Sequence, residues 1–209
     1  MKTATLALVI PALLIVLNCC VTTPGRGTPV DAGSSAPAGT VTLRGETLHL
    51  AGTPLRVGEP FPATTLIDAF TLKEVDLSLF KGKVLVVSVV PSLDTRVCEA
   101  QTHYLGEPVA RLPADVVRIT ISRDTPFAQK RFAEEAGLTG ITYLSDYRDG
   151  SFGRATGLLQ KVSMLLGRAV IVADREGIVR YIQVVPELTH LPDMESAFRH
   201  AEALSAAGK

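Results

Sequence analysis

The 209-residue chain has little cysteine, no tryptophan and no net charge. It contains three cysteines, and its 21 Lys+Arg balance 21 Asp+Glu. Without an excess of positive charge, the chain lacks the phosphate contacts that drive nucleic-acid binding. Three cysteines and four histidines, with no Cys-x-x-Cys pair, provide little material for a structural metal site. The length and the 46% of hydrophobic residues predict one soluble globular domain with an additional segment.

The first 20 residues have the pattern of a signal peptide. A positive start at Lys2 precedes residues 4–17, an apolar run too short for a permanent membrane-spanning helix. The run ends in VLNCC, which is typical of a bacterial lipoprotein signal, with an aliphatic residue three places before the lipid-bearing cysteine. Small Cys19 before it favours Cys20 as the lipidation site, with Cys19 as the alternative. A plain secreted protein and a buried N-terminal helix are the other interpretations.

Residues 21–40 are rich in Pro, Gly, Ser, Thr and Ala and cannot bury enough apolar surface to order themselves. We expect a flexible tether with a reach of roughly 25 Å, followed by a domain at residues 41–209. No acidic residue stands immediately after the lipidation site, which weakly favours the outer membrane over the inner one. The sequence thus predicts an exported bacterial lipoprotein at the periplasmic face of a membrane or the cell surface, attached only through its lipid anchor.

The domain alternates between strand and helix patterns. Residues 41–50 predict a β-hairpin, and the apolar run 84–90, broken only by Ser88, predicts a strand buried on both faces. Further strands are predicted at 115–121, 168–173 and 178–185, and helices at 95–111, 126–136 and 192–207. Gly106 and Pro108 are expected to bend or shorten the first helix. This order predicts an α/β domain with a mixed central sheet flanked by helices.

Cys98 is the single cysteine of the domain and lies in the first turn of the helix after the buried strand. Free amide N–H groups and the positive end of the helix dipole stabilise an anion there. An ordinary thiol, with a pKa of about 8.5, is only about 3% ionised at pH 7. A reactive thiolate therefore needs a cation nearby as well. From placement alone, Cys98 is either a nucleophile or a small buried hydrophobic side chain.

Three other residues each allow a structural and a functional interpretation. Thr95 either caps the helix or donates a hydrogen bond to the sulfur or to a substrate oxygen. Pro91 either ends the strand or shields a thiolate from water and from larger partners. Arg168, at the start of an apolar strand, either forms a surface salt bridge or places its guanidinium beside the sulfur. The positions alone leave these alternatives open.

The pattern Pro91-x-x-x-Thr95-x-x-Cys98 resembles the active-site motif of the peroxiredoxins. Longer segments are similar to the bacterial thiol peroxidase subfamily: PSLDTRVC at 91–98, TISRDTPFAQKRF at 120–132, LSDYRDGSFG at 144–153, GRAVIVADREG at 167–177 and VPELTHLPD at 185–193. The similarity extends from about residue 40 to the C-terminal helix. It implies a thioredoxin-like fold with an added N-terminal β-hairpin, commonly as a homodimer.

The resemblance also implies a reaction with hydrogen peroxide or an organic hydroperoxide. The Cys98 thiolate attacks the terminal peroxide oxygen and becomes a sulfenic acid, while water or an alcohol leaves. Thr95 and Arg168 stabilise the charge that develops on the two oxygens, and Pro91 is their partner in the motif. This chemistry requires no metal and no organic cofactor.

One position departs from the subfamily pattern. Where relatives carry a cysteine that resolves the sulfenic acid into an internal disulfide, this chain has Ala133. Three interpretations follow: reduction by an external thiol or thioredoxin-like protein, resolution by an unlipidated Cys19 or Cys20, or a peroxide sensor or binding lipoprotein with little turnover.

Two other activities on this fold fit the sequence less well. A thiol–disulfide reductase needs a second cysteine, yet Thr95 and Gln101 occupy the positions three residues from Cys98. A copper-delivery protein needs more ligands than Cys98 and His103. A non-enzymatic lipoprotein gives no reason for Pro91, Thr95, Cys98 and Arg168 to occur together.

Overall fold

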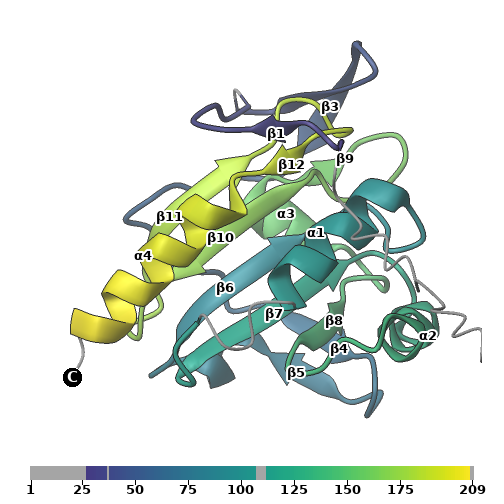
Figure 1. Cartoon of the computed structure of the whole chain (residues 1–209). Coiled ribbons are helices and arrows are strands. Elements are labelled where there is room, and N and C mark those ends of the chain that lie inside the picture. The colour runs from purple at the N-terminus through teal and green to yellow at the C-terminus, as the bar shows by residue number, and fades with distance from the viewer. Residues whose placement is uncertain (1–26, 37, 107–111, 208–209) are drawn as a thin grey trace, which may run out of the picture.

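The computed structural model describes residues 27–36, 38–106 and 112–207. The fold is built around a twisted seven-stranded sheet (Figure 1). The strands lie in the order β11-β10-β6-β7-β8-β4-β5. Their bounds are β4 Thr65–Asp68, β5 Glu74–Asp76, β6 Val84–Val89, β7 Val116–Ser122, β8 Thr142–Ser145, β10 Ala169–Ala173 and β11 Val179–Val184. Strands β6, β7 and β8 are parallel, and all other neighbours are antiparallel. The predicted α/β class with a mixed central sheet is confirmed.

Helices cover both faces of this sheet. They are α1 Arg96–Gly106, α2 Pro126–Ala136, α3 Ser151–Thr156 and α4 Met194–Ala207, with a short 3₁₀ helix, η1, at Leu77–Phe80. In Figure 1, α1 and α4 lie in front of the sheet and α3 lies behind it. Val84 and Val86 of β6 pack on the side of α4, whereas Leu85 and Val87 pack on the side of α3. Because strand side chains alternate between faces, β6 is apolar along its whole length.

The N-terminal hairpin predicted at residues 41–50 is present. It consists of β2 (Thr40–Leu43) and β3 (Glu46–Ala51), which pair antiparallel, and β9 (Leu159–Gln160) joins as a third strand. The turn residues Arg44 and Gly45 have φ angles of 51° and 84°. A two-residue turn with left-handed backbone at both positions matches the twist of the strands it joins.

Helix α2 has the predicted bounds because both of its ends are encoded locally. The hydroxyl of Thr125 accepts a hydrogen bond from the amide of Ala128, and Pro126 fits the first turn. Gly137 ends the helix in the left-handed region, with a φ of 63°. Helix α1 is described to Gly106, and the part of its prediction at residues 107–111 lies outside the described residues.

The C-terminal helix starts two residues later than predicted. Leu191–Pro192 form a short strand, β12, and α4 begins at Met194. The carboxylate of Asp193 accepts a hydrogen bond from the amide of Ser196 at 2.9 Å. This carboxylate satisfies a free donor of the first turn, so the helix begins after Asp193 and not at Pro192.

Residues 27–36, which we call the N-terminal arm, lie against the domain. Strand β1 (Val30–Asp31) pairs in parallel with β12, beside which it lies at the top of Figure 1. The amide of Ala36 donates to the carbonyl of Val184 at 2.7 Å. Backbone hydrogen bonds therefore hold this stretch against the domain, whereas its composition predicted a flexible tether. The leader 1–20 and residues 21–26 lie outside the described residues.

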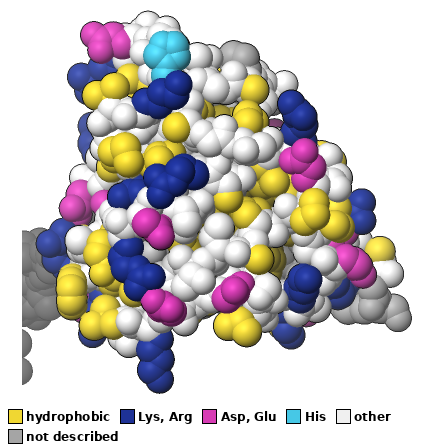
Figure 2. Space-filling model, turned by 180° about the vertical axis from the view of Figure 1, so that it is seen from behind, with side chains coloured by type: hydrophobic (Ala, Val, Ile, Leu, Met, Phe, Trp, Pro, Cys, Tyr) yellow, Lys and Arg dark blue, Asp and Glu magenta, His cyan; other side chains and the backbone are white. Residues whose placement is uncertain are grey.

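The surface carries both signs of charge. Figure 2 shows Lys and Arg interspersed with Asp and Glu over the face opposite to that of Figure 1, in keeping with the balanced composition. Among the described residues, no helix is long and apolar enough to cross a membrane.

Candidate active site

The structure places Arg168 directly against the sulfur of Cys98. Ala169, the first residue of β10, is paired with Val89, the last residue of β6. From the end of β6 the chain continues into α1, which carries Cys98 in its first turn. Nη2 of Arg168 donates to Sγ of Cys98 at 3.3 Å. Cys98 is 0% exposed and Arg168 is 2% exposed. The alternative of a surface salt bridge for Arg168 is therefore wrong.

Two further acceptors fix the guanidinium in place. Nη1 of Arg168 donates to Oε1 of Gln101 at 2.8 Å, and Nε donates to the carbonyl of Leu188 at 3.0 Å. Each nitrogen of the guanidinium thus has an acceptor, as a buried polar group requires. The orientation of Arg168 is therefore set by the fold before any substrate arrives.

Gln101 is a site residue that the sequence analysis missed. It is fully buried, and its Nε2 donates to Oγ of Ser88 at 2.9 Å and to the carbonyl of Ala169 at 3.1 Å. Its position three residues after Cys98, on the same helix face, was a usable signal. The hydrogen bond also explains why Ser88 interrupts the apolar run of β6.

Among the described residues, the guanidinium of Arg168 donates its hydrogen bonds to two neutral oxygens and to the sulfur. The ion pairs found in the described ranges do not include this residue. A buried cation without a carboxylate partner is costly unless a negative charge compensates it. Arg168 therefore brings its positive charge into contact with the sulfur of Cys98.

A carboxylate at the end of β7 holds the loop that leads to Cys98. Asp124 accepts hydrogen bonds of 2.7 Å from the hydroxyl of Ser92, the amide of Leu93 and the hydroxyl of Ser122. Three donors on one carboxylate make a firm link between β7 and this loop. Sequence reasoning did not identify Asp124, because the residues it joins are about 30 positions apart.

Thr95 does not make the capping bond that its position predicts. Its hydroxyl donates to the carbonyl of Ser92 at 3.0 Å instead of accepting an amide of the first turn of α1. The side chain of Thr95 is exposed and Pro91 is half-buried. The oxygen of this exposed hydroxyl can still accept a hydrogen bond from a bound molecule.

Pro91, Thr95 and Arg168 all line one cavity of about 780 Å³. Its remaining walls are formed by Gly27, Thr28, Pro29, Leu43, Arg44, Arg96, Val97, Gln160, Leu165, Leu188 and Thr189. Cys98 itself is buried behind these residues. The structure thus brings the four predicted site residues together, with the sulfur covered and the guanidinium reaching the cavity.

Glu187 anchors the segment that carries the carbonyl of Leu188. Burial acts to raise the pKa of Glu187, but hydrogen bonds from the amides of Arg44 and Gly45 and the hydroxyls of Thr42 and Thr189 outweigh it. The net effect lowers the pKa from 4.5 to about 2. The carboxylate thereby connects the hairpin turn to the acceptor that orients Arg168.

We expect Glu187→Gln to change the acid stability of the protein. A group with a lowered pKa in the folded state stabilises the fold above its unfolded pKa of 4.5, and this contribution is lost as the pH falls toward 2. The variant should have a smaller free energy of unfolding at pH 7 and a shallower loss between pH 4.5 and 2. Urea unfolding at several pH values measures both, and parallel curves for wild type and variant would disprove the role of Glu187.

Ala133 lies in α2 and is 4% exposed. It belongs to the same buried apolar cluster as Cys98, together with Phe132 and Tyr143. In the described part of the chain, Cys98 is a free cysteine, and His, Cys, Asp and Glu form no group that could hold a metal ion.

Comparison with known proteins gives consistent matches. Residues 56–198 match the Redoxin family. The chain is 44% identical over 163 residues to a thiol peroxidase of Halalkalibacterium halodurans, covering 78% of this chain and 97% of that protein. It is 42% identical over 164 residues to a thiol peroxidase of Bacillus subtilis, with the same shares covered.

The solved structures agree. The crystal structure of a peroxiredoxin-like protein from Aquifex aeolicus superimposes with a TM-score of 0.73 at 35% identity, covering 81% of this chain and 99% of that one. A thiol peroxidase from Chromobacterium violaceum, at 23% identity and a TM-score of 0.66, shares the fold over 81% of this chain and 96% of its own. The thioredoxin-like fold is thereby confirmed, and the chain belongs to the Redoxin family as a peroxiredoxin-type peroxidase related to the bacterial thiol peroxidases.

Proposed function

We propose that the protein reduces hydrogen peroxide and organic hydroperoxides with Cys98 as the nucleophile. The thiolate attacks the terminal peroxide oxygen, an S–O bond forms and the O–O bond breaks, and the leaving oxygen takes a proton to become water or an alcohol. Cys98 is left as a sulfenic acid. The observation that carries this proposal is the hydrogen bond from the buried guanidinium of Arg168 to the sulfur of Cys98.

In this reaction Arg168 and Thr95 bind the peroxide from the cavity side. Arg168 stabilises the thiolate and the charge on the departing oxygen, and Thr95 offers its hydroxyl to the peroxide, with Pro91 shielding the sulfur from water. Because Cys98 is covered, the loop from Pro91 to Thr95 must shift for the peroxide to reach it. The three bonds on Asp124 then limit how far this loop moves.

The sulfenic acid is reduced by an external thiol or a thioredoxin-like protein. Ala133 supplies no sulfur in the cluster around Cys98, so an internal disulfide with the usual partner cannot form. Resolution by Cys19 or Cys20 is the alternative within the chain. We also expect two copies to form a homodimer, as the peroxiredoxin resemblance implies.

Peroxide consumption with dithiothreitol as electron donor tests the function. A purified peroxidase consumes many equivalents of hydrogen peroxide per Cys98. The complete burial of Cys98 favours a peroxide sensor as a second candidate. If dithiothreitol does not reach the covered sulfenic acid of such a sensor, the protein consumes about one equivalent of peroxide and then stops. Consumption equal to that of buffer would disprove both.

Restoring the missing thiol as Ala133→Cys should produce an internal disulfide. Ala133 shares the cluster of Cys98, and a hollow of about 260 Å³, lined by Leu93 of the loop before α1 and by Phe132 and Ala136 of α2, leaves space for the two segments to approach. After peroxide treatment we expect a monomer lighter by two hydrogen atoms, reducible by thioredoxin. Disulfide geometry is strict, with Cα atoms within about 7 Å, so local unwinding is required.

Glu134→Cys, next to Ala133 in α2 but exposed and outside the cluster of Cys98, is the matched control. It should give no disulfide with Cys98, and it should leave Cys98 as sensitive to overoxidation as in the wild type. If Ala133→Cys yields only sulfenic or sulfinic Cys98, the correspondence of Ala133 with the resolving position is wrong.

We further propose that lipidation at Cys20, or at Cys19, attaches the protein to the periplasmic face of the outer membrane or to the cell surface. The support is the apolar leader and its VLNCC ending. Because hydrogen bonds hold the arm to the domain from Pro29, the nine residue steps from Cys20 span at most about 32 Å. The cavity, which Gly27 lines, would then lie close to the membrane surface.

Growth with labelled palmitate tests this anchor. The full-length protein should become labelled and sediment with membranes, and replacement of both Cys19 and Cys20 by serine should abolish the label. Label that persists in the double variant would contradict the lipoprotein assignment.

A further inference from the structure

We propose that the start of the N-terminal arm, residues 27–29, forms a wall of the active-site cavity and limits the size of the hydroperoxide that reaches Cys98. The inference rests on the proposed function of this site. It assigns a role in substrate selection to a segment that precedes the Redoxin match at residues 56–198.

The arm is part of the cavity wall. Gly27, Thr28 and Pro29 line the same space as Pro91 and Arg168. Gly27 and Pro29 are exposed, whereas Thr28 is half-buried. Thr28 is therefore the least exposed of the three residues and carries a side chain at the cavity wall, so we expect a change in its volume to change the space left for a substrate.

Hydrogen bonds to the domain begin at the residue after Thr28. The amide of Leu191 donates to the carbonyl of Pro29 at 2.7 Å. Asp31 Oδ1 and His190 Nδ1 lie 3.0 Å apart. The side-chain amide of Gln183, which is buried, donates to the carbonyls of Asp31 and Ser34. These bonds hold the arm in a fixed position beside β12 and β11.

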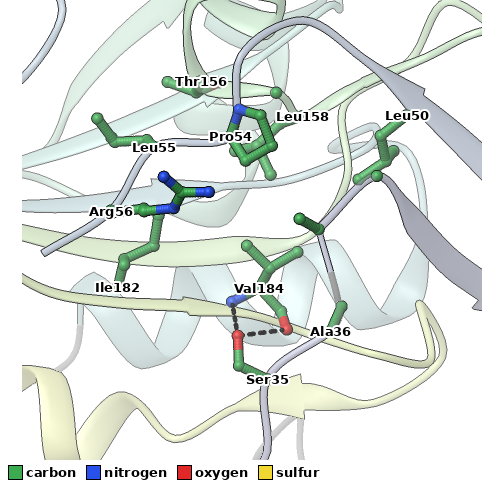
Figure 3. A pocket seen from close by; sticks show the side chains of 13 residues that line it. Ser35, Ala36, Leu50, Pro54, Leu55, Arg56, Thr156, Leu158, Ile182 and Val184 are labelled. Atoms are coloured by element: carbon green, nitrogen blue, oxygen red, sulfur yellow. Dashed lines mark hydrogen bonds between the residues drawn. The ribbon is translucent and has the colours of Figure 1, made fainter.

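The second half of the arm is held along β11 as well. Figure 3 shows Ser35 beside Val184, and its hydroxyl accepts from the amide of Val184 at 3.1 Å and donates to its carbonyl at 3.3 Å. Ser35 and Ala36 close one side of a small hollow of about 190 Å³, opposite Leu55 and Arg56. The arm is therefore held to the domain from Pro29 to Ala36, and Gly27 and Thr28 directly precede this held stretch at the cavity.

The size of the cavity determines which substrates meet this wall. Hydrogen peroxide is little larger than a water molecule, which occupies roughly 30 Å³ in the liquid, whereas the cavity has about 780 Å³. A small peroxide next to Arg168 leaves most of this space empty. A hydroperoxide with a large organic group extends from Arg168 toward the other walls, one of which is the arm. Substitutions at Thr28 should therefore change kcat/KM for large hydroperoxides far more than kcat/KM for hydrogen peroxide.

The test compares kcat/KM for cumene hydroperoxide with kcat/KM for hydrogen peroxide in four variants of the full chain. Thr28→Phe should lower this ratio about tenfold, and Thr28→Gly should raise it, as expected when groups are added to or removed from an apolar pocket. Ser34→Phe and Ser34→Gly are the matched controls, because Ser34 lies in the same arm, is exposed and does not line the cavity. Their ratio should equal that of the wild type.

An unchanged ratio in both Thr28 variants, or an equal change in both groups of variants, would overturn the inference while the peroxidase activity stands. A wild-type protein that consumes neither peroxide would instead disprove the proposed function. The two failures are thus distinguished by the wild-type measurement alone.

Discussion

Peroxide consumption falls to the uncatalysed background when Cys98 is replaced by serine. The sulfur is the proposed nucleophile, and a hydroxyl at the same position is not ionised near neutral pH. Serine is nearly isosteric, and the hydrogen bond from Thr102 Oγ1 to residue 98 goes to the backbone carbonyl, so the fold should persist. Stopped-flow or colorimetric measurement of peroxide, with circular dichroism as a check on folding, gives the result.

The control for this variant is a protein with Cys19 and Cys20 both replaced by serine. It should retain the wild-type rate with dithiothreitol, because the chemistry resides in Cys98 alone. If Cys98→Ser keeps more than background activity, Cys98 is not the nucleophile. If the double variant loses its turnover, one of the leader cysteines resolves the sulfenic acid.

Arg168→Met should lower kcat/KM for hydrogen peroxide by about 10²–10³, the usual effect of removing one preorganised charge-stabilising donor. The variant removes the only guanidinium in hydrogen-bond contact with the sulfur among the described residues. Alkylation of Cys98 by iodoacetamide should also require a higher pH, because the thiolate loses its cation. The rate of alkylation as a function of pH separates this effect from a merely structural one.

Arg175→Met is the matched control at the other end of β10. Arg175 contacts Asp115 at 2.7 Å and the carbonyl of Leu204 at 2.9 Å, far from the cavity lining. Its replacement should reduce stability without shifting the alkylation profile of Cys98. An Arg168→Met variant that behaves like Arg175→Met would show that the guanidinium does not act on the sulfur.

Sequence patterns predicted the elements whose signals are local. The strand at Val84–Val89 follows from a long apolar run, and α2 follows from Thr125, Pro126 and Gly137 at its ends. Strands β4, β5, β8 and β9 have two to four residues each and are too short for a periodic pattern. Strand β1 was unpredictable because its bonds are made by the backbone with β12, about 160 residues away.

For the candidate site, the sequence indicated which four residues would lie together, but not the residues that hold them in place. The spacing from Pro91 to Cys98 and the resemblance around Arg168 indicated the four residues that the structure brings together. Gln101, Asp124 and the carbonyl of Leu188 depend on how strands and loops are paired, which no local pattern encodes. The position of Thr28 in the cavity wall could not be predicted either, because its segment has the composition of a linker.

The chemical state of Cys98 after one equivalent of peroxide is the most direct measurement. The reduced protein is treated with hydrogen peroxide, trapped with dimedone and analysed by peptide mass spectrometry. The proposed reaction predicts dimedone on Cys98, complete within the time of one turnover and absent when dithiothreitol is added first. Unmodified Cys98 alongside consumed peroxide, or peroxide that is not consumed at all, would contradict the sulfenic acid mechanism.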